Sequence, residues 1–174
     1  MAEKKLFDNL YKVIKVNSGA ISANDVVATE ILDLQIPRGY CARIRKVRFA
    51  LRDISGQDNV DFGWHILTAC VLDADDENSV AIPTFEIDHD VLIDHRWEMW
   101  GDFPATDGLT SLWTPQKVYN FDEELDVVTV RNIRHNSLIN GMDVTGVKPQ
   151  VELTVYFTYE KISADLYAKL LGIS

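Results

Sequence analysis

Strict alternation of apolar and polar residues is the sequence feature that most constrains the fold of this chain. Between Val151 and Tyr159, every second residue is aliphatic or aromatic, and the residues between them are Glu, Thr or Tyr. Because successive side chains of a β-strand point to opposite faces, this period of two predicts a strand with one buried face. The segment 60–72 follows the same pattern. We therefore expect an inner face formed by Val151, Leu153, Val155, Phe157 and Tyr159 together with Phe62, Trp64 and Ile66.

Further β-strands are predicted between turn signals along most of the chain. Gly, Pro, Asn and Asp cluster at the intervening positions, and these residues favour turns. About eight strands joined by long loops are typical of an antiparallel sandwich, so the expected fold class is all-β. We expect two four-stranded sheets with jelly-roll topology, and an immunoglobulin-like sandwich is the alternative. The other predicted strands are 26–36, 41–52, 79–87, 91–99, 116–120 and 125–133.

Helical patterns occur only near the two ends of the sequence. Near the C-terminus, Ser163 is a candidate N-cap, and Leu166 and Leu170 have helical spacing. Near the N-terminus, Lys4–Ile14 has apolar residues at helical spacing, although the alternation in residues 11–16 also fits a strand. We therefore divide the chain into an N-terminal arm or helix (1–15), a jelly-roll sandwich (16–162) and a C-terminal helix (163–174).

The charge and composition of the chain disfavour several classes of function. With 17 basic and 27 acidic residues, the net charge is −10, which argues against a general nucleic-acid binder because phosphate attraction needs a positive face. The sequence has no apolar run of 18 or more residues, so no transmembrane helix is expected, and its first residues do not resemble a signal peptide. Cys41 and Cys70 are too few for a disulfide framework, and we expect both to be buried free thiols.

The segment 39–53 carries five of the 17 basic residues, which is unusual in an acidic protein. Ile44 falls in the opposite phase to the apolar residues after it, so the sequence predicts a β-bulge near Arg45–Lys46. The cations can pair with neighbouring acids on an outward strand face, or they can form a positive patch that meets an acidic surface of another subunit. Nucleic acid is a third possible partner, although the acidic remainder of the surface would repel it. The expected basic face is Lys46, Arg48 and Arg52, opposite an apolar face of Val47, Phe49 and Leu51.

Two acidic segments are candidates for metal binding. In residues 88–95, His89 and His95 share a strand face but lie about 20 Å apart in an extended chain, too far for one ion to bridge. Asp88 and Asp90 offer two carboxylates to an oxygen-ligand site, and residues 73–78 begin like a calcium loop without matching the EF-hand pattern. Solvated charged segments are the simpler interpretation of both, so no metal and no cofactor is expected.

No sequence motif specifies a reaction. The chain contains no nucleophile elbow, Walker loop, zinc-protease motif or Cys-x-x-Cys pair, so we expect no catalytic residue and no enzyme activity. The aromatic residues concentrate around Trp97, Trp100 and Trp113, where they fit core packing, a sugar-stacking platform or a protein–protein interface. We take these three residues, with the basic face, as candidates for a subunit interface.

The layout resembles the single jelly-roll capsid proteins of icosahedral viruses. It looks most like the small major capsid proteins of membrane-containing archaeal and thermophile viruses, the sphaerolipovirus-like group. Three features carry the resemblance: the short arm at Lys4–Ile14, the early strand pair joined by IPRGY, and the closing strand VELTVYFTYEKIS with its short terminal helix.

The resemblance implies a non-enzymatic subunit that forms homo-oligomeric capsomers of an icosahedral shell, with a second capsid protein as a further partner. It also implies contact between the N-terminal arm and an internal membrane, no specific nucleic acid, synthesis in the host cytoplasm and a place in the virion. Two other classes stay open. One is a carbohydrate- or receptor-binding sandwich of a phage tail or fibre, and the other is a small enzyme of cupin type.

Overall fold

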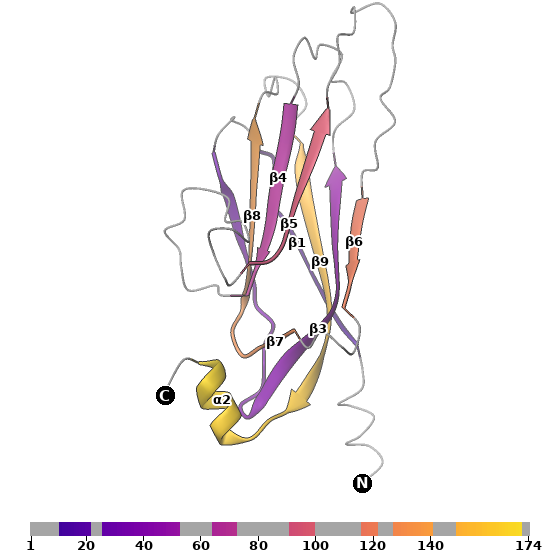
Figure 1. Ribbon diagram of the computed structural model, residues 1–174. Coiled ribbons are helices and arrows are strands. Elements are labelled where there is room, and N and C mark those ends of the chain that lie inside the picture. The colour runs from indigo at the N-terminus through magenta and orange to yellow at the C-terminus, as the bar shows by residue number, and fades with distance from the viewer. Residues whose placement is uncertain are drawn as a thin grey trace, which may run out of the picture.

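The computed structural model describes residues 11–21, 26–52, 64–72, 91–99, 116–121, 127–140 and 149–171. The strands share one long direction, and the only helix in these ranges lies at one end of them (Figure 1). In chain order the elements are β1 (Lys12–Asn17), β2 (Ala28–Leu32), β3 (Tyr40–Arg52), β4 (Trp64–Val71), β5 (Val91–Met99), β6 (Gln116–Asn120), β7 (Val128–Thr129), β8 (Ile133–Asn140), β9 (Gln150–Lys161) and α2 (Ala164–Leu170).

The strands form two antiparallel sheets, so the predicted all-β sandwich is confirmed. Sheet A has the order β1-β9-β3-β6, with the short β7 also paired to β3, and sheet B has the order β2-β8-β4-β5. If β7 is set aside, eight strands remain in the described ranges. The first pairs with the last and the third with the sixth in sheet A, while the second pairs with the seventh and the fourth with the fifth in sheet B. This nested pairing is the strand order of a jelly roll, so the immunoglobulin-like alternative is excluded.

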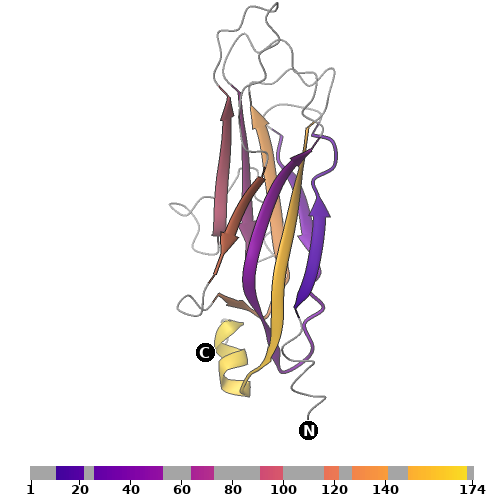
Figure 2. The ribbon, with the colours of Figure 1, turned by 90° about the vertical axis from the view of Figure 1, so that its right-hand side faces the viewer.

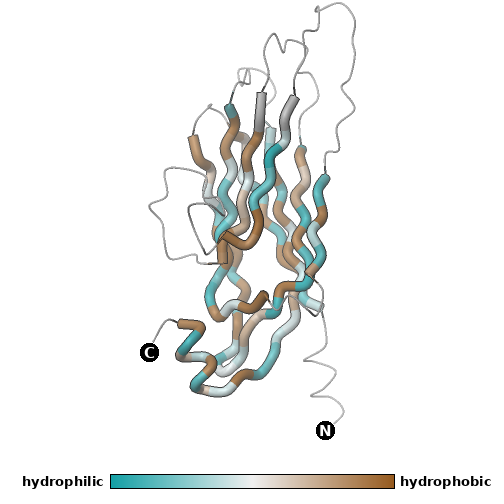
Figure 3. The backbone as a smooth tube through the Cα atoms, in the orientation of Figure 1, coloured by the Kyte–Doolittle hydropathy of each residue, from teal (hydrophilic) through white to brown (hydrophobic). Residues whose placement is uncertain are grey.

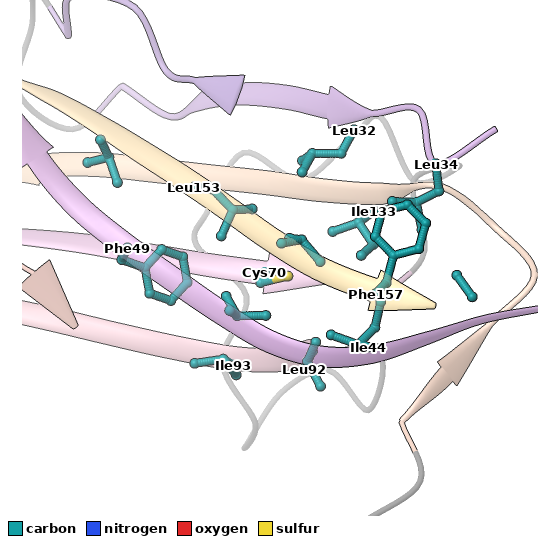
Figure 4. Close-up of a cluster of buried hydrophobic side chains, with 14 of the residues drawn as sticks. Leu32, Leu34, Ile44, Phe49, Cys70, Leu92, Ile93, Ile133, Leu153 and Phe157 are labelled. Atoms are coloured by element: carbon teal, nitrogen blue, oxygen red, sulfur yellow. The ribbon is translucent and has the colours of Figure 1, made fainter. Parts of the chain in front are cut away.

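A single apolar core fills the space between the two sheets. In Figure 4, Phe49 and Leu153 of sheet A face Cys70 and Ile93 of sheet B. The predicted inner face of β9 is confirmed, and Ile66 joins it from β4, while Phe62 and the side chain of Trp64 lie outside the described part. The β9 residues in the core are Val151, Leu153, Val155, Phe157 and Tyr159.

The strand β3 shows how the sequence sets both the core and the surface. Hydropathy alternates along it and its neighbours (Figure 3), and its buried side chains Val47, Phe49 and Leu51 belong to the core. The register with β9 shifts between Ile44 and Lys46, so Arg45 is the extra residue of a β-bulge. The bulge confirms the prediction made from the phase change, because it turns Ile44 to the same side as the apolar residues that follow.

The predicted strand at 125–133 is only partly confirmed. In the described part of that range the structure has the two-residue β7, and the longer strand β8 begins only at Ile133. This strand lies between β2 and β4 in sheet B and is buried on both faces. Its residues 134–137 are all polar, so the sequence lacks both the alternation and the apolar run that would have indicated a strand.

The two ends of the described chain also differ in part from expectation. β1 begins at Lys12, so the last four residues of the expected arm (1–15) belong to sheet A, in agreement with the alternative strand reading of 11–16. Residues 1–10 lie outside the described ranges. At the other end, Ser163 caps α2 by accepting a hydrogen bond from the backbone N–H of Leu166, as predicted. Among the described residues, no helix has the length and apolar character needed to cross a membrane.

Candidate functional site

The outward side of β3 and β9 in sheet A carries a dense set of charges, which we call the charged face. Figure 2 shows these two strands side by side at the centre of sheet A, between β1 and β6. The face arises because the residues that alternate with the core side chains of the two strands are mostly Arg, Lys, Glu and Thr. Its charged members are Arg43, Arg45, Lys46, Arg48, Arg52, Glu152 and Glu160.

Glu152 accepts contacts from two arginines of the neighbouring strand. Nη2 of Arg48 lies 3.0 Å from its Oε1, and Nη2 of Arg52 lies 3.5 Å from its Oε2. In the register, Glu152 stands opposite Ala50, which is only 1% exposed. The small Ala50 side chain therefore leaves room for the arginines on either side of it to reach the same carboxylate diagonally.

Glu160 repeats this arrangement at the other end of the strand pair. Nη2 of Arg43 lies 2.7 Å from its Oε2, and Nη2 of Arg45, the bulge residue, lies 3.6 Å from its Oε1. Cys41 stands directly opposite Glu160. Burial raises the pKa of the Cys41 thiol, and the negative charge of Glu160 raises it further. The thiol therefore stays protonated at neutral pH and is a poor nucleophile. Both cysteines are buried and free, as predicted.

The long side chains of the charged face also cover the strands beneath them. Nζ of Lys46 lies 5.3 Å from the centre of the Tyr156 ring, within the range of a cation–π contact. Thr154 lies on the same face opposite Arg48 and is completely buried. Arginine and lysine stems can bury surface in this way while their charged ends stay near water. The face is therefore an ordered layer, in which guanidinium groups are held above a tightly covered sheet.

The charged face is positive although the protein is acidic. Its five cations and two carboxylates sum to +3, so the rest of the chain, with a total of −10, sums to −13. Each carboxylate is shared by two arginines, and Lys46 rests on an aromatic ring. Four arginines therefore share two carboxylates, and this pairing leaves the face with a net positive charge. Such a patch is suited to a negatively charged partner surface.

The structure places the sequence-derived interface candidates in different environments. Lys46, Arg48 and Arg52 all lie on the charged face. Trp97 was expected at an interface, but it is 5% exposed and packs edge-on against Phe49 inside the sandwich. Its position on the inner side of β5 explains this burial, so Trp97 is a core residue of this chain. Trp100 and Trp113 lie outside the described residues.

The metal-binding candidates lie only partly within the described ranges. The described ranges do not include residues 73–78, nor Asp88, His89 and Asp90. Nδ1 of His95 lies 3.0 Å from the hydroxyl of Tyr119. This contact joins β5 of sheet B to β6 of sheet A. Burial lowers the pKa of His95, and nearby Lys117 lowers it further. In the ranges that the structure describes, no three His, Cys, Asp or Glu side chains gather as metal ligands do.

A buried polar group in β8 was not found from the sequence. Nε2 of His135 lies 2.8 Å from the hydroxyl of Thr68, which donates to the backbone carbonyl of Asn136 at 3.3 Å. Burial lowers the pKa of His135 to about 3, so the ring is neutral at physiological pH. The sequence RNIRHNSLIN resembles an exposed loop, and the only signal that could have revealed a strand is the pair of apolar residues Ile133 and Ile139 six positions apart.

Neither a protein-family model nor a curated protein matches the chain. Among solved structures, the chain is similar to the VP1 protein of Merkel cell polyomavirus, which was solved in complex with GD1a oligosaccharide. The similarity covers 86% of this chain and 77% of that one, at 7% sequence identity and a TM-score of 0.31. Because this TM-score is low, the jelly-roll assignment rests on the observed strand order.

Proposed function

We propose that this protein is a structural subunit of a viral shell, whose charged face binds an acidic surface of a neighbouring subunit. Viral capsid proteins are one of the main classes built on the jelly roll. The observation that carries the proposal is the +3 charged face on a chain of net charge −10. Copies of a uniformly acidic protein repel one another, so a shell requires positive and negative patches that meet.

The finer proposal is a single jelly-roll capsid protein of the sphaerolipovirus-like kind, which the sequence resembles. Such a subunit forms homo-oligomeric capsomers in the virion, associates with a second capsid protein and directs its N-terminal arm toward an internal membrane. It has no catalytic role and binds no specific nucleic acid. The described ranges support the arrangement required for this, because the compact sandwich leaves one broad side of sheet A open and charged.

Two other jelly-roll functions predict features that differ from those described. A sugar-binding module requires a platform of aromatic rings on an open surface. Among the described residues, Trp97 is in the core, Tyr156 is covered by Lys46, and Tyr11 is the one largely exposed aromatic side chain. A cupin-type enzyme requires metal ligands between the sheets. There, His135 contacts Thr68 and lies 6.2 Å from the ring of Phe49. The charged face therefore favours a structural role over both alternatives.

Assembly of the purified protein tests the proposal. Size-exclusion chromatography with light scattering, followed by electron microscopy of the concentrated protein, should show oligomers that dissociate as salt rises, because screening shortens the reach of surface charges. The double variant Arg48→Glu/Arg52→Glu should stay folded, because the two ion pairs that it removes are partly exposed to solvent and surface pairs each contribute only about 0–1 kcal/mol. Its assembly should be impaired.

A matched control has the same change in net charge at another site. Lys161→Glu/Lys169→Glu alters two exposed lysines outside the charged face, and this variant should assemble as the wild type does. If both double variants assemble equally well and with unchanged salt dependence, the charged face is ordinary solvated surface and the proposal is wrong. Loss of tight DNA binding in the Arg48→Glu/Arg52→Glu variant would instead identify nucleic acid as the partner of this face.

A further inference from the structure

The outward side of sheet B contains a buried cation that the proposed shell contact does not use. Along β8, Ile133 and His135 point toward the core between the sheets, so Arg134 and Asn136 lie on the opposite, outward side. Outward residues of a two-sheet sandwich are normally in contact with water. Arg134 is nevertheless only 2% exposed and Asn136 is 0% exposed.

Polar atoms of both side chains are shielded and have no hydrogen-bond partner in the structure. These atoms are Nε and Nη1 of Arg134, and Nδ2 and Oδ1 of Asn136. An arginine keeps its positive charge in proteins and presents only donors. Shielded guanidinium donors without a hydrogen-bond partner are unfavourable in a folded protein, and an unpaired amide adds to the cost.

The neighbouring strands place mainly apolar side chains beside this site, and the polar exception is Thr29 of β2, which stands beside Asn136. The register of β4 places Val71 beside Arg134 and Ala69 beside Asn136. Together with Val91 of β5, these two residues form a small buried apolar cluster separate from the main core. On the other side, β2 places Ile31 beside Arg134. Apolar surroundings lower the local dielectric, which strengthens the attraction between the guanidinium and any anion that reaches it.

We propose that Arg134 and Asn136 form a binding site for a single oxyanion group, a carboxylate or a phosphate. The two residues are two positions apart on one strand face, about 7 Å at the rise of an extended chain, so both can contact one small group between them. The guanidinium donates charge-assisted hydrogen bonds to the anion, and Nδ2 of Asn136 donates another. The anion is either a free ion or the carboxylate of a second copy of the chain.

A thermal-unfolding series on the full chain tests this site. Phosphate and acetate are titrated at constant ionic strength maintained with sodium chloride, at two protein concentrations tenfold apart. If a free anion binds, the melting temperature of the wild type should rise by about 3–5 °C for each tenfold increase of one anion above its dissociation constant. If a second copy supplies the carboxylate, the melting temperature should rise with protein concentration instead.

Two variants connect either response to the site. Arg134→Met replaces the buried charge with an apolar side chain of similar length, a change that buried sites often tolerate, and it should abolish the response. Arg52→Gln removes a more exposed arginine of the charged face, and this variant should keep the melting-temperature response. A wild-type melting temperature that depends on neither anion nor protein concentration would overturn the proposal, as would a response that Arg134→Met retains.

Discussion

Arg48 and Glu152 form a diagonal ion pair across β3 and β9, with Nη2 of the arginine 3.0 Å from Oε1 of the glutamate. In the register, Arg48 stands opposite Thr154, and Glu152 stands opposite Ala50. The ion pair therefore joins two residues that are diagonal neighbours in the register, and it passes above the small Ala50 side chain. Because Arg52 reaches the same carboxylate from the other side, Glu152 is the central residue of this half of the charged face.

Neutralising Glu152 should cost more than removing either of its partners. Glu152→Gln leaves Arg48 and Arg52 close together without an anion, whereas Arg52→Gln removes only a 3.5 Å contact of a half-exposed side chain. We expect a loss of about 1 kcal/mol for the first variant and under about 0.5 kcal/mol for the second. Urea unfolding at low and high salt measures the difference, which salt should reduce. Equal losses in the two variants would contradict a shared role of Glu152.

Truncation of Phe157 should be among the most damaging core substitutions in β9. Its ring is 3% exposed and packs edge-on against Tyr159 at a centroid distance of 5.5 Å. Phe157→Ala should lower the free energy of unfolding by about 3–5 kcal/mol because it leaves a cavity between the sheets. Val118→Ala, at a position that is 40% exposed, serves as the control and should change it by less than about 0.5 kcal/mol. A loss under about 1 kcal/mol for Phe157→Ala would be inconsistent with a fully packed core.

Mild acid should destabilise the protein through His135. The unfolded chain takes up a proton near the ordinary histidine pKa of 6.5, whereas burial lowers the pKa of the folded-state ring to about 3. Between these values the unfolded state binds more protons, so stability is complete above pH 6.5 and falls as pH decreases, by about 1.4 kcal/mol per pH unit for this one group.

Chemical unfolding between pH 5 and 7 checks the slope, since most carboxylates remain ionised there. His135→Gln should flatten the pH dependence, whatever its effect at pH 7. The pKa of His95 is also lowered, with burial as its main cause, so His95→Gln shows how much of the slope belongs to the second ring. An unchanged slope in His135→Gln would mean that the histidine is accessible to protons in the folded state.

Loss of the α2 cap should remain a local event. The Ser163 side chain accepts the N–H of Leu166 at 3.2 Å, and α2 contains no buried residue. Ser163→Ala removes about 0.5–2 kcal/mol from the helix. Few apolar contacts tie the helix to the sandwich, so we expect faster amide exchange in α2 and almost unchanged global unfolding. A large drop in the global free energy of unfolding would show that the helix is part of the cooperative core.

The sequence allows strands to be predicted where one face is apolar and the other is polar. In β3 the alternation of Phe49 with Arg48 predicted the core side, the charged side and the bulge. The ion pairs with Glu152 could not be predicted, because they depend on which strand lies beside β3. In β8 the pattern failed for a physical reason: Arg134 and His135 point to opposite faces, yet both are buried, so polarity no longer indicates exposure.

The bulge at Arg45 also determines where β3 can lose a residue without exchanging its two faces. Before it, the odd-numbered residues of β3 face outward, and after it the even-numbered residues do so. Deleting one residue after Lys46 would turn core side chains out and arginines in. Deleting Arg45 itself would restore continuous pairing and leave every other side chain on its own face. A deletion scan along β3 should therefore tolerate the loss of Arg45, or of Lys46, whose outward place Arg45 would then take, better than the loss of any other residue of the strand.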